Sequence, residues 1–589
     1  MDEQLRRLAE AHGVATHYEN AEQRRVEVDS DVVEAILREL RADAPKPELP
    51  PTIVLREGET ADLKGPAVVH LEDGTERRTG RHLPEDLPLG WHRIVTKDQE
   101  ITLAVAPRRL PDVPRAWGWM LQLYAARSDE SWGMGDFCDL ATIARRSSLE
   151  LDAGVLLVNP VQAISPTHPV ERSPYSPSSR RYANPLYLRI SDTSAYLTAD
   201  EETRRKVDAL KPPNRELIDY DEIWDAKRKA LELLWRDEPQ EMDEDLRTFA
   251  TFCAIAETEG PDWRQWPARQ QNPETATASS ERIRFHAWLQ HLCIAQLDEV
   301  RLAAHEAGMA VGVIHDLPVG VHPGGADTWA QRSVYARATV GAPPDAFAKD
   351  GQDWNLPPWR PDKLAETGYA PFVQVLRSVL RHGDGIRIDH VAGLWRLWWI
   401  PEGEPPSRGT YVYYDADAML GVLALEAHRA GAVVVGEDLG TVEPVVTKTL
   451  QENGMLTSAV LWFQRDWDAP GHPIVPPRQW NQHAMASIST HDLPTAATYL
   501  SEHPDFGELM AAEGLDPADP VEGAHALLAQ APCALVLTSP QDALGETRQP
   551  NLPGTIDEYP NWRIPLPVPL DEFFSRVRSV VRPLRVRDR

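Results

Sequence analysis

Long apolar runs are missing from this sequence of 589 residues, and cysteine and basic residues are scarce. No stretch approaches the roughly 20 consecutive apolar residues that a membrane-spanning helix requires, so we expect a protein that does not span a membrane. The N-terminal segment 1–20 also lacks the apolar core and small-residue cleavage site of a secretory signal. We therefore expect a cytoplasmic location.

The few cysteines are widely separated along the chain and are Cys138, Cys253, Cys293 and Cys533. Such spacing gives neither a disulfide framework nor a zinc-binding pattern, so we expect buried free thiols. His315 stands beside Asp316, but the sequence has no His pair at i, i+4 with an acidic partner and no calcium-binding loop. We expect no metal and no organic cofactor.

Basic residues are outnumbered, because 61 Lys and Arg against 90 Asp and Glu give a net charge of −29. This charge repels the phosphate backbone of nucleic acids, so we expect no nucleic-acid partner. A neutral substrate is easier to accommodate.

Two small modules are predicted at the start of the chain. In the first, at about 1–45, Val33, Ile36 and Leu37 recur at helical spacing. A proline-rich joint, APKPELPP, follows it. Short apolar or alternating runs separated by Gly and Asp turns then predict a small β-sandwich-like module over 50–108: TIVLRE, AVVHLE, WHRIVT and ITLAVAP.

From about residue 113 the pattern changes to short apolar strands, each followed by helical periodicity, which is typical of a parallel α/β architecture. Eight strand candidates have the continuous apolar runs expected of strands buried on both faces: GWMLQLYAA, GVLLVNP, MAVGVIHDLP, GIRIDHV, AVVVGEDLG, AVLWF, MASISTHD and APCALVLTSPQD. They predict a closed (β/α)₈ TIM barrel over 113–589. About 150 residues separate the second strand from the third, so we expect an inserted helical subdomain at about 185–305.

Polar side chains stand at the ends of three of these strands, where the active sites of such barrels lie. Strand alternation places Arg387 and Asp389 on one face, where the guanidinium can keep the carboxylate ionised, as a nucleophile requires. Glu437 ends the next strand without such a cation and could keep its proton as a general acid. The two residues form the pair that retaining glycoside chemistry requires, with carboxyl groups about 5 Å apart.

A series of motifs stands along the barrel region, from about 118 to 563: SWGMGDFCDL, SPYSPSSRRYANPLYL, HDLPVGVHPGGADTWA, VGAPPDAFAKDGQDWNLPPW, GIRIDHVAGLWRLWWIP, VVVGEDLGTV, STHDLPT and NLPGTIDEYPNWR. In this order they resemble the motifs of the 4-α-glucanotransferases, also called amylomaltases, whose barrel is of the α-amylase type. The N-terminal region resembles the extra module of the longer bacterial, actinobacterial-like members.

The resemblance implies a retaining enzyme that moves α-1,4-glucan segments between malto-oligosaccharides. It implies that Asp389 is the nucleophile, that Glu437 is the general acid/base, and that Asp492 is a third carboxylate holding sugar hydroxyls in the transition state. The segment 342–355 would be the loop that covers the acceptor side and keeps water out. The other implied substrate-binding residues are Arg387, which supports the nucleophile, Asp316, His491, Ser173, Tyr175, Trp354 and Asn551.

Two alternatives remain open from the sequence. An α-amylase-like hydrolase would use the same three carboxylates, and the segment 342–355 together with SPYSPSSRRYANPLYL argues against it. A non-catalytic glucan-binding protein would keep the aromatic residues and lose a carboxylate, whereas all three carboxylates are present. Of the 19 Trp residues only Trp354 is assigned to the site, and LWRLWWIP is expected to serve packing. His322, His390 and Asp438 are expected to be structural or to support the residues that touch the substrate.

Overall fold

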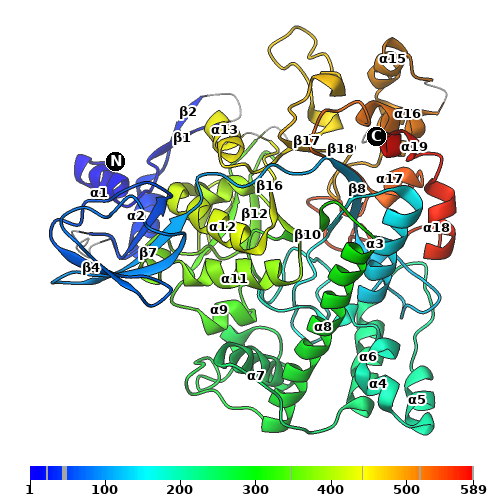
Figure 1. Cartoon of the computed structure of the whole chain (residues 1–589), viewed down its shortest axis with the longest axis horizontal. Helices are drawn as coiled ribbons and strands as arrows, with labels where there is room; N and C mark the ends of the chain where they lie inside the picture. The colour runs from blue at the N-terminus through cyan, green and yellow to red at the C-terminus, as the bar shows by residue number, and fades with distance from the viewer. Residues whose placement is uncertain (21–23, 43–48, 346–347, 441, 517–518, 587–589) are drawn as a thin grey trace.

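The computed structural model of the chain describes all residues except 21–23, 43–48, 346–347, 441, 517–518 and 587–589. Figure 1 shows the N-terminal elements, in blue, gathered on one side of a larger α/β body. The long helix α8 (Ser280–Glu306), in green, runs through the lower part of that body toward α3 in this view.

Eight parallel strands form one sheet that closes on itself. In the sheet they stand in the order β16-β13-β10-β9-β8-β19-β18-β17, and a parallel bridge between Val435 and Leu456 brings β16 next to β17. The predicted (β/α)₈ barrel is confirmed, and each predicted strand segment overlaps one of its strands. The strands are β8 (Ala116–Leu121), β9 (Val155–Val158), β10 (Gly312–Leu317), β13 (Gly385–Ile388), β16 (Val433–Gly436), β17 (Thr457–Val460), β18 (Ala484–Ser487) and β19 (Leu535–Thr538).

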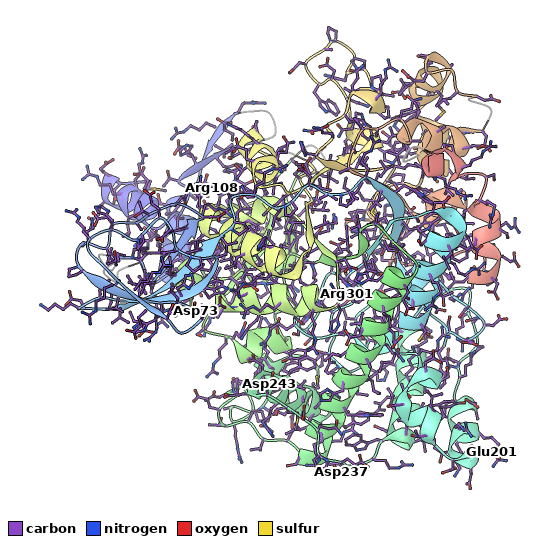
Figure 2. The ribbon with its side chains drawn as sticks, in the orientation of Figure 1. Asp73, Arg108, Glu201, Asp237, Asp243 and Arg301 are labelled. Carbon is purple, nitrogen blue, oxygen red and sulfur yellow. The ribbon has the colours of Figure 1, made fainter. Side chains whose placement is uncertain are left out.

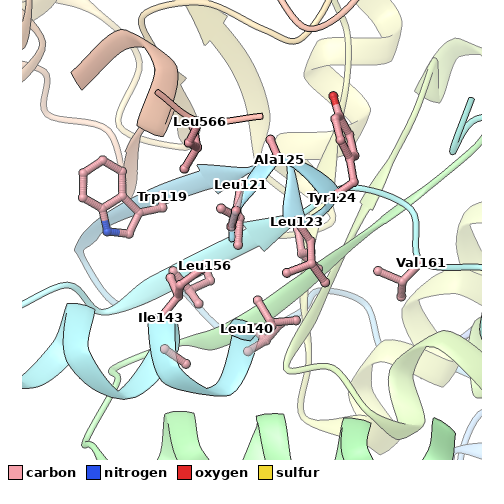
Figure 3. Packing of buried hydrophobic residues seen from close by; sticks show 14 of the residues in the cluster. Trp119, Leu121, Leu123, Tyr124, Ala125, Leu140, Ile143, Leu156, Val161 and Leu566 are labelled. Atoms are coloured by element: carbon pink, nitrogen blue, oxygen red, sulfur yellow. The ribbon is translucent and has the colours of Figure 1, made fainter. Parts of the chain in front are cut away.

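Both faces of the barrel strands are buried, which explains their continuous apolar runs. Side chains such as Met120, Leu157 and Ile314 belong to the cluster inside the barrel. The opposite faces pack against surrounding helices, as Figure 3 shows for Leu156 beside helix α3 (Phe137–Leu151). Burying one such leucine stabilises the fold by about 1.5–3 kcal/mol.

The chain between β9 and β10 is mostly helical, as predicted. Its longer helices are α6 (Tyr220–Leu234), α7 (Glu244–Glu259) and α8, and the shorter ones are α4 (Ser194–Thr198) and α5 (Glu201–Asp208). The side chain of Asp243 accepts a hydrogen bond from the Leu246 N–H and so caps α7. Figure 2 marks Asp243 at this helix start. Helix α8 packs against both α3 and α7, so it links the inserted helices to the barrel.

The first N-terminal elements are helix α1 (Glu3–Ala11), an antiparallel hairpin of β1 (His17–Glu19) and β2 (Arg25–Glu27), and helix α2 (Ser30–Glu39). The helix predicted around Val33 is α2, and its apolar face is buried. The hairpin was not predicted, because its strands have three residues each and are largely polar. Most of the proline-rich joint lies outside the described residues.

A five-stranded sheet follows, with the order β3-β7-β6-β4-β5. Its strands are β3 (Thr52–Arg56), β4 (Ala67–His70), β5 (Glu76–Thr79), β6 (Gly90–Val95) and β7 (Glu100–Ala106). Four of them were predicted, whereas β5 has the sequence ERRT and carries no apolar signal. The sheet contacts barrel helix α12 (Ala416–Ala430) through β3 and β7. Gly421 permits this approach, because a Cβ atom there would lie 2.4 Å from Val54 Cγ1.

A four-stranded sheet next to the barrel was not predicted. Its strands are β11 (Ala338–Ala342), β12 (Gln352–Leu356), β14 (Arg396–Pro401) and β15 (Thr410–Tyr413), in the order β12-β11-β14-β15. Trp398 and Trp399 of β14 are buried, so the packing role expected for LWRLWWIP is confirmed. The segment 342–355 is not a loop throughout, because β12 pairs with β11 despite its polar sequence.

Three of the four cysteines are buried as expected, whereas Cys138 is only partly buried. No disulfide joins any of the four within the described part of the chain. Within the described ranges, no helix combines the length and the apolar character needed to cross a bilayer.

Candidate active site

The ends of neighbouring barrel strands bring the predicted charged residues together. β10 and β13 pair in parallel with Asp316 opposite Arg387. Asp389 directly follows β13, and Glu437 directly follows β16. The Glu437 N–H donates a hydrogen bond to the Ile388 carbonyl over 3.0 Å. The hydrogen bonding between β13 and β16 therefore continues one residue beyond β16, to Glu437.

A cleft of about 920 Å³ opens over these strand ends. Eight of the ten predicted site residues line it: Ser173, Tyr175, Trp354, Asp389, Glu437, His491, Asp492 and Asn551. The other two, Asp316 and Arg387, are buried and hydrogen-bonded to residues of the cleft. The structure therefore brings all ten predicted residues into one site.

Arg387 joins two carboxylates beneath the cleft. Its Nη1 donates to Asp316 Oδ1 over 2.6 Å and to Asp389 Oδ1 over 3.0 Å. Burial alone would lower the pKa of Arg387, but the charges of Asp316 and Asp389 raise that pKa well above its ordinary value. The guanidinium is therefore a permanent cation next to the proposed nucleophile.

The balance of charges at Asp389 differs from our expectation. Burial raises the pKa of Asp389 to about 6, Arg387 opposes this shift, and the negative charges of Asp316 and Glu437 add to it. We expected Arg387 to dominate, but the cation only limits the effect of burial. Because this pKa lies below neutrality, the Asp389 carboxylate is still mostly ionised at pH 7.

Glu437 lies in a different environment from Asp389. Its Oε2 accepts a hydrogen bond from the His390 N–H over 2.9 Å, and its Oε1 accepts one from the Leu439 N–H over 2.8 Å. Burial raises the pKa of Glu437, while Arg387 and the two N–H groups oppose this shift. The net effect favours the protonated form, which is the form that a general acid needs.

Asp492 is held by two side chains of the same site. Asn551 Nδ2 donates to Asp492 Oδ1 over 2.6 Å, and His491 Nε2 lies 3.4 Å from Asp492 Oδ2. Burial would raise the pKa of Asp492, but the charge and hydrogen bond of His491, together with Asn551, lower that pKa below its ordinary value. Asp492 is therefore an ionised acceptor that faces the cleft.

Tyr175 belongs to the inner part of the site. Its hydroxyl donates to Asp316 Oδ2 over 2.7 Å and lies 3.1 Å from His491 Nδ1. The Tyr175 and His491 rings stack with their centroids 4.5 Å apart. The centroid of the Trp562 ring lies 5.5 Å from the centroid of each of these two rings, and Trp562 also lines the cleft. Trp562 was not predicted as a site residue, although it lies in the motif NLPGTIDEYPNWR.

The remaining predicted contacts lie along the cleft. Ser173 Oγ accepts a hydrogen bond from the Tyr175 N–H over 3.2 Å. The Trp354 ring packs edge-on against His390, with centroids 5.2 Å apart. His390, which was expected to be structural or to support the residues that touch the substrate, also lines the cleft and has a left-handed backbone with φ of 48°. Asp438 anchors the chain by accepting hydrogen bonds from the Thr447 hydroxyl and the Ser458 N–H.

Part of the segment 342–355 reaches this cleft. Gln352 and Trp354 of β12 line it, whereas residues 346–347 of the segment lie outside the described residues. In the part of the chain that the structure describes, no three His, Cys, Asp or Glu side chains gather in a way that could hold a metal ion.

Comparisons with known proteins agree with this architecture. A family model described as 4-alpha-glucanotransferase matches residues 121–570, and a model described as MalQ N-terminal beta sandwich domain matches residues 48–107. The 4-alpha-glucanotransferase of Mycobacterium tuberculosis is 40% identical over 657 aligned residues, covering 93% of this chain and 90% of the relative. The 4-alpha-glucanotransferase of Haemophilus influenzae is 31% identical, and the match covers 83% of this chain and 82% of the relative.

Solved structures give the same result. Amylomaltase from Corynebacterium glutamicum superposes with a TM-score of 0.86 at 34% identity, covering 98% of this chain and 99% of that chain. Amylomaltase from Streptococcus agalactiae in complex with acarbose has a TM-score of 0.68 at 18% identity, covers 80% of this chain and 99% of its own, and so shares the fold. With this sequence identity, this coverage and this barrel, the chain belongs to the 4-alpha-glucanotransferase family.

Proposed function

We propose that this 4-alpha-glucanotransferase moves α-1,4-glucan segments between malto-oligosaccharides in two displacement steps. Asp389 is the nucleophile, Glu437 is the general acid and base, and Asp492 holds sugar hydroxyls in the transition state. The observation that supports these roles best is that the three carboxyl groups line one cleft in three different electrostatic environments.

In the first step the Asp389 carboxylate attacks the anomeric carbon of the donor. The bond between that carbon and the oxygen of the leaving glucan breaks, and the Glu437 proton passes to this oxygen. The product is a covalent glycosyl ester on Asp389. Arg387 limits the pKa of Asp389 and so keeps the carboxylate available at neutral pH.

In the second step a hydroxyl group of an acceptor sugar attacks the same carbon. Its proton passes to Glu437, and the Asp389 carboxylate leaves. Each displacement inverts the configuration, so the α-linkage is retained. The aromatic side chains of Tyr175 and Trp354 line the cleft. They would hold the acceptor sugar in place, so that its hydroxyl group reacts with the glycosyl ester before water does.

Asp492→Asn should lower kcat about 10²-fold while changing KM far less. The carboxylate would bind sugar hydroxyls most strongly as the ring flattens, so its loss removes an interaction of the transition state. Steady-state kinetics with maltotriose measure both constants. An effect confined to KM would contradict this role.

Activity should fall as the pH drops below about 6. Asp389 must be ionised to attack, and burial raises its pKa to about 6, so protonation in this range removes the nucleophile. Asp316→Asn removes one of the negative charges that raise this pKa, so the acid limb of kcat/KM should move to lower pH. A pH profile of both proteins tests this, and a limb that stays in place or moves upward would contradict it.

Incubation of the pure protein with maltotriose tests the proposed function. Transfer should give glucose and a ladder of longer maltodextrins, with little net gain in reducing ends. A hydrolase would instead give glucose and maltose while the reducing ends rise in step. A protein that only binds glucans would leave maltotriose unchanged.

The proposal also includes a cytoplasmic location and the absence of nucleic-acid partners. The net charge of −29 supports the second point, because it repels phosphate backbones.

A further inference from the structure

A small polar cavity lies behind the segment that carries His491 and Asp492. Its volume is about 10 Å³, and of its lining residues only His491 also lines the catalytic cleft. The other polar residues around it are Gln122, Ser489, Thr490, Thr495, Ser539 and Gln541. This volume corresponds to about one water molecule.

Three buried oxygen atoms on this cavity have no hydrogen-bond partner among the described protein atoms. They are Gln122 Oε1, Thr495 Oγ1 and Gln541 Oε1. Their residues are only 5%, 2% and 5% exposed, so bulk water does not reach them. Because buried polar atoms in folded proteins nearly always have a partner, three such atoms around one cavity indicate a bound molecule.

The Asp542 carboxylate holds both ends of the same segment. Its Oδ2 accepts a hydrogen bond from the Ser489 hydroxyl over 2.5 Å, and its Oδ1 accepts one from the Ala496 N–H over 2.7 Å. The segment between these two contacts carries His491 and Asp492. Asp542 follows β19, is fully buried and neighbours Gln541 in helix α17 (Pro540–Ala543).

We propose that one water molecule occupies this cavity and that it acts with Asp542 to fix the segment 489–496 beneath the reacting sugar. Gln541 and Asp542 are then positioning residues that act through Asp492. The inference rests on the proposed role of Asp492 in the transition state.

Water fits this cavity better than a cation does. A glutamine side chain can present either its oxygen or its NH₂ group to a neighbour. Water donates and accepts hydrogen bonds, so it satisfies Gln122 and Gln541 in either orientation. A cation would need oxygen from both residues.

A crystal structure of the active protein at high resolution tests the water site. One peak within hydrogen-bond distance of Gln122, Thr495 and Gln541 is expected, and Gln541→Leu should remove it. An unfilled cavity in the wild-type protein would overturn the proposal. A peak with the short contacts and oxygen-only ligands of a metal ion would overturn it as well.

A double-mutant cycle tests the positioning role. Asp542→Asn should lower kcat for maltotriose about 10-fold or more with little change in KM, because small displacements of catalytic groups have large effects on rate. The amide oxygen can still accept from the Ala496 N–H, but the carboxylate oxygen that accepts from the Ser489 hydroxyl becomes an NH₂ group, so that charge-assisted hydrogen bond is lost. In an Asp492→Asn background the same change should have little further effect, since Asp542 acts through Asp492.

The controls separate positioning from general stability. Asp384→Asn removes another buried carboxylate, which accepts from the Val313 N–H and pairs with Arg301 of α8, labelled in Figure 2. Asp384 precedes β13 and lies at the opposite end of the barrel strands, so its loss should lower the melting temperature and leave kcat largely unchanged.

The possible failures can be told apart. Losses in kcat that multiply in the Asp542 and Asp492 double variant would overturn the positioning role alone. Full kcat in Asp492→Asn would instead contradict the proposed function. If Asp542→Asn does not fold, Gln541→Leu replaces it in the same double-mutant cycle. Losses in kcat from Gln541→Leu and Asp492→Asn that multiply in the double variant would then overturn the positioning role.

Discussion

Replacing Asp389 with Asn should reduce kcat for maltotriose by roughly 10⁴-fold or more, which is the range seen when a catalytic nucleophile is removed. An amide has no negative charge with which to attack the anomeric carbon, so the covalent intermediate cannot form. The variant keeps a group of the same size, and its amide oxygen can still accept a hydrogen bond from Arg387. Initial rates of glucose release measure the effect.

A matched control for this variant is Asp438→Asn. Asp438 is also a carboxylate at the end of a barrel strand, but its hydrogen bonds go to Thr447 and Ser458, away from the cleft. We expect this variant to keep most of its kcat. Near-wild-type turnover in Asp389→Asn would remove Asp389 from the role of nucleophile, whatever the control shows.

Replacing Glu437 with Gln should lower kcat for maltotriose by about 10²- to 10⁴-fold, the usual contribution of general acid–base catalysis. Glutamine cannot protonate the oxygen of the leaving glucan. A glycosyl fluoride needs little protonation of its leaving group, so the first step should remain fast with α-maltotriosyl fluoride. Stopped-flow measurement of fluoride release gives the rate of this step.

The difference in activity between the two donors tests the role of Glu437 as the acid. Loss of activity with maltotriose and retention of fluoride release support the acid role. Equal losses with both donors would contradict it, because they would point to damage to the nucleophile or to binding.

The barrel could be predicted because its strands are buried on both faces. Segments such as GIRIDHV are continuous apolar runs, and polar residues appear only where a strand approaches its end. For the same reason Asp389 and Glu437 could be placed in one site from sequence position alone. Parallel neighbouring strands bring their ends to the same side of the barrel.

Features that depend on tertiary contacts could not be predicted in this way. β12 has a polar sequence that indicates a turn, and it forms a strand only because β11 pairs with it. The pKa of Asp389 depends on burial and on Asp316 of a different strand, neither of which can be read from the motif. The stacking of Tyr175 on His491 joins loops that follow different strands.

Trapping the covalent intermediate tests the central claim most directly. Glu437→Gln incubated with α-maltotriosyl fluoride and no acceptor should accumulate a protein whose mass is increased by one maltotriosyl group. Peptide mapping by mass spectrometry should place that group on the peptide GIRIDH, at Asp389. A label on Asp316 or Asp492, or steady fluoride release with no labelled protein, would contradict the account.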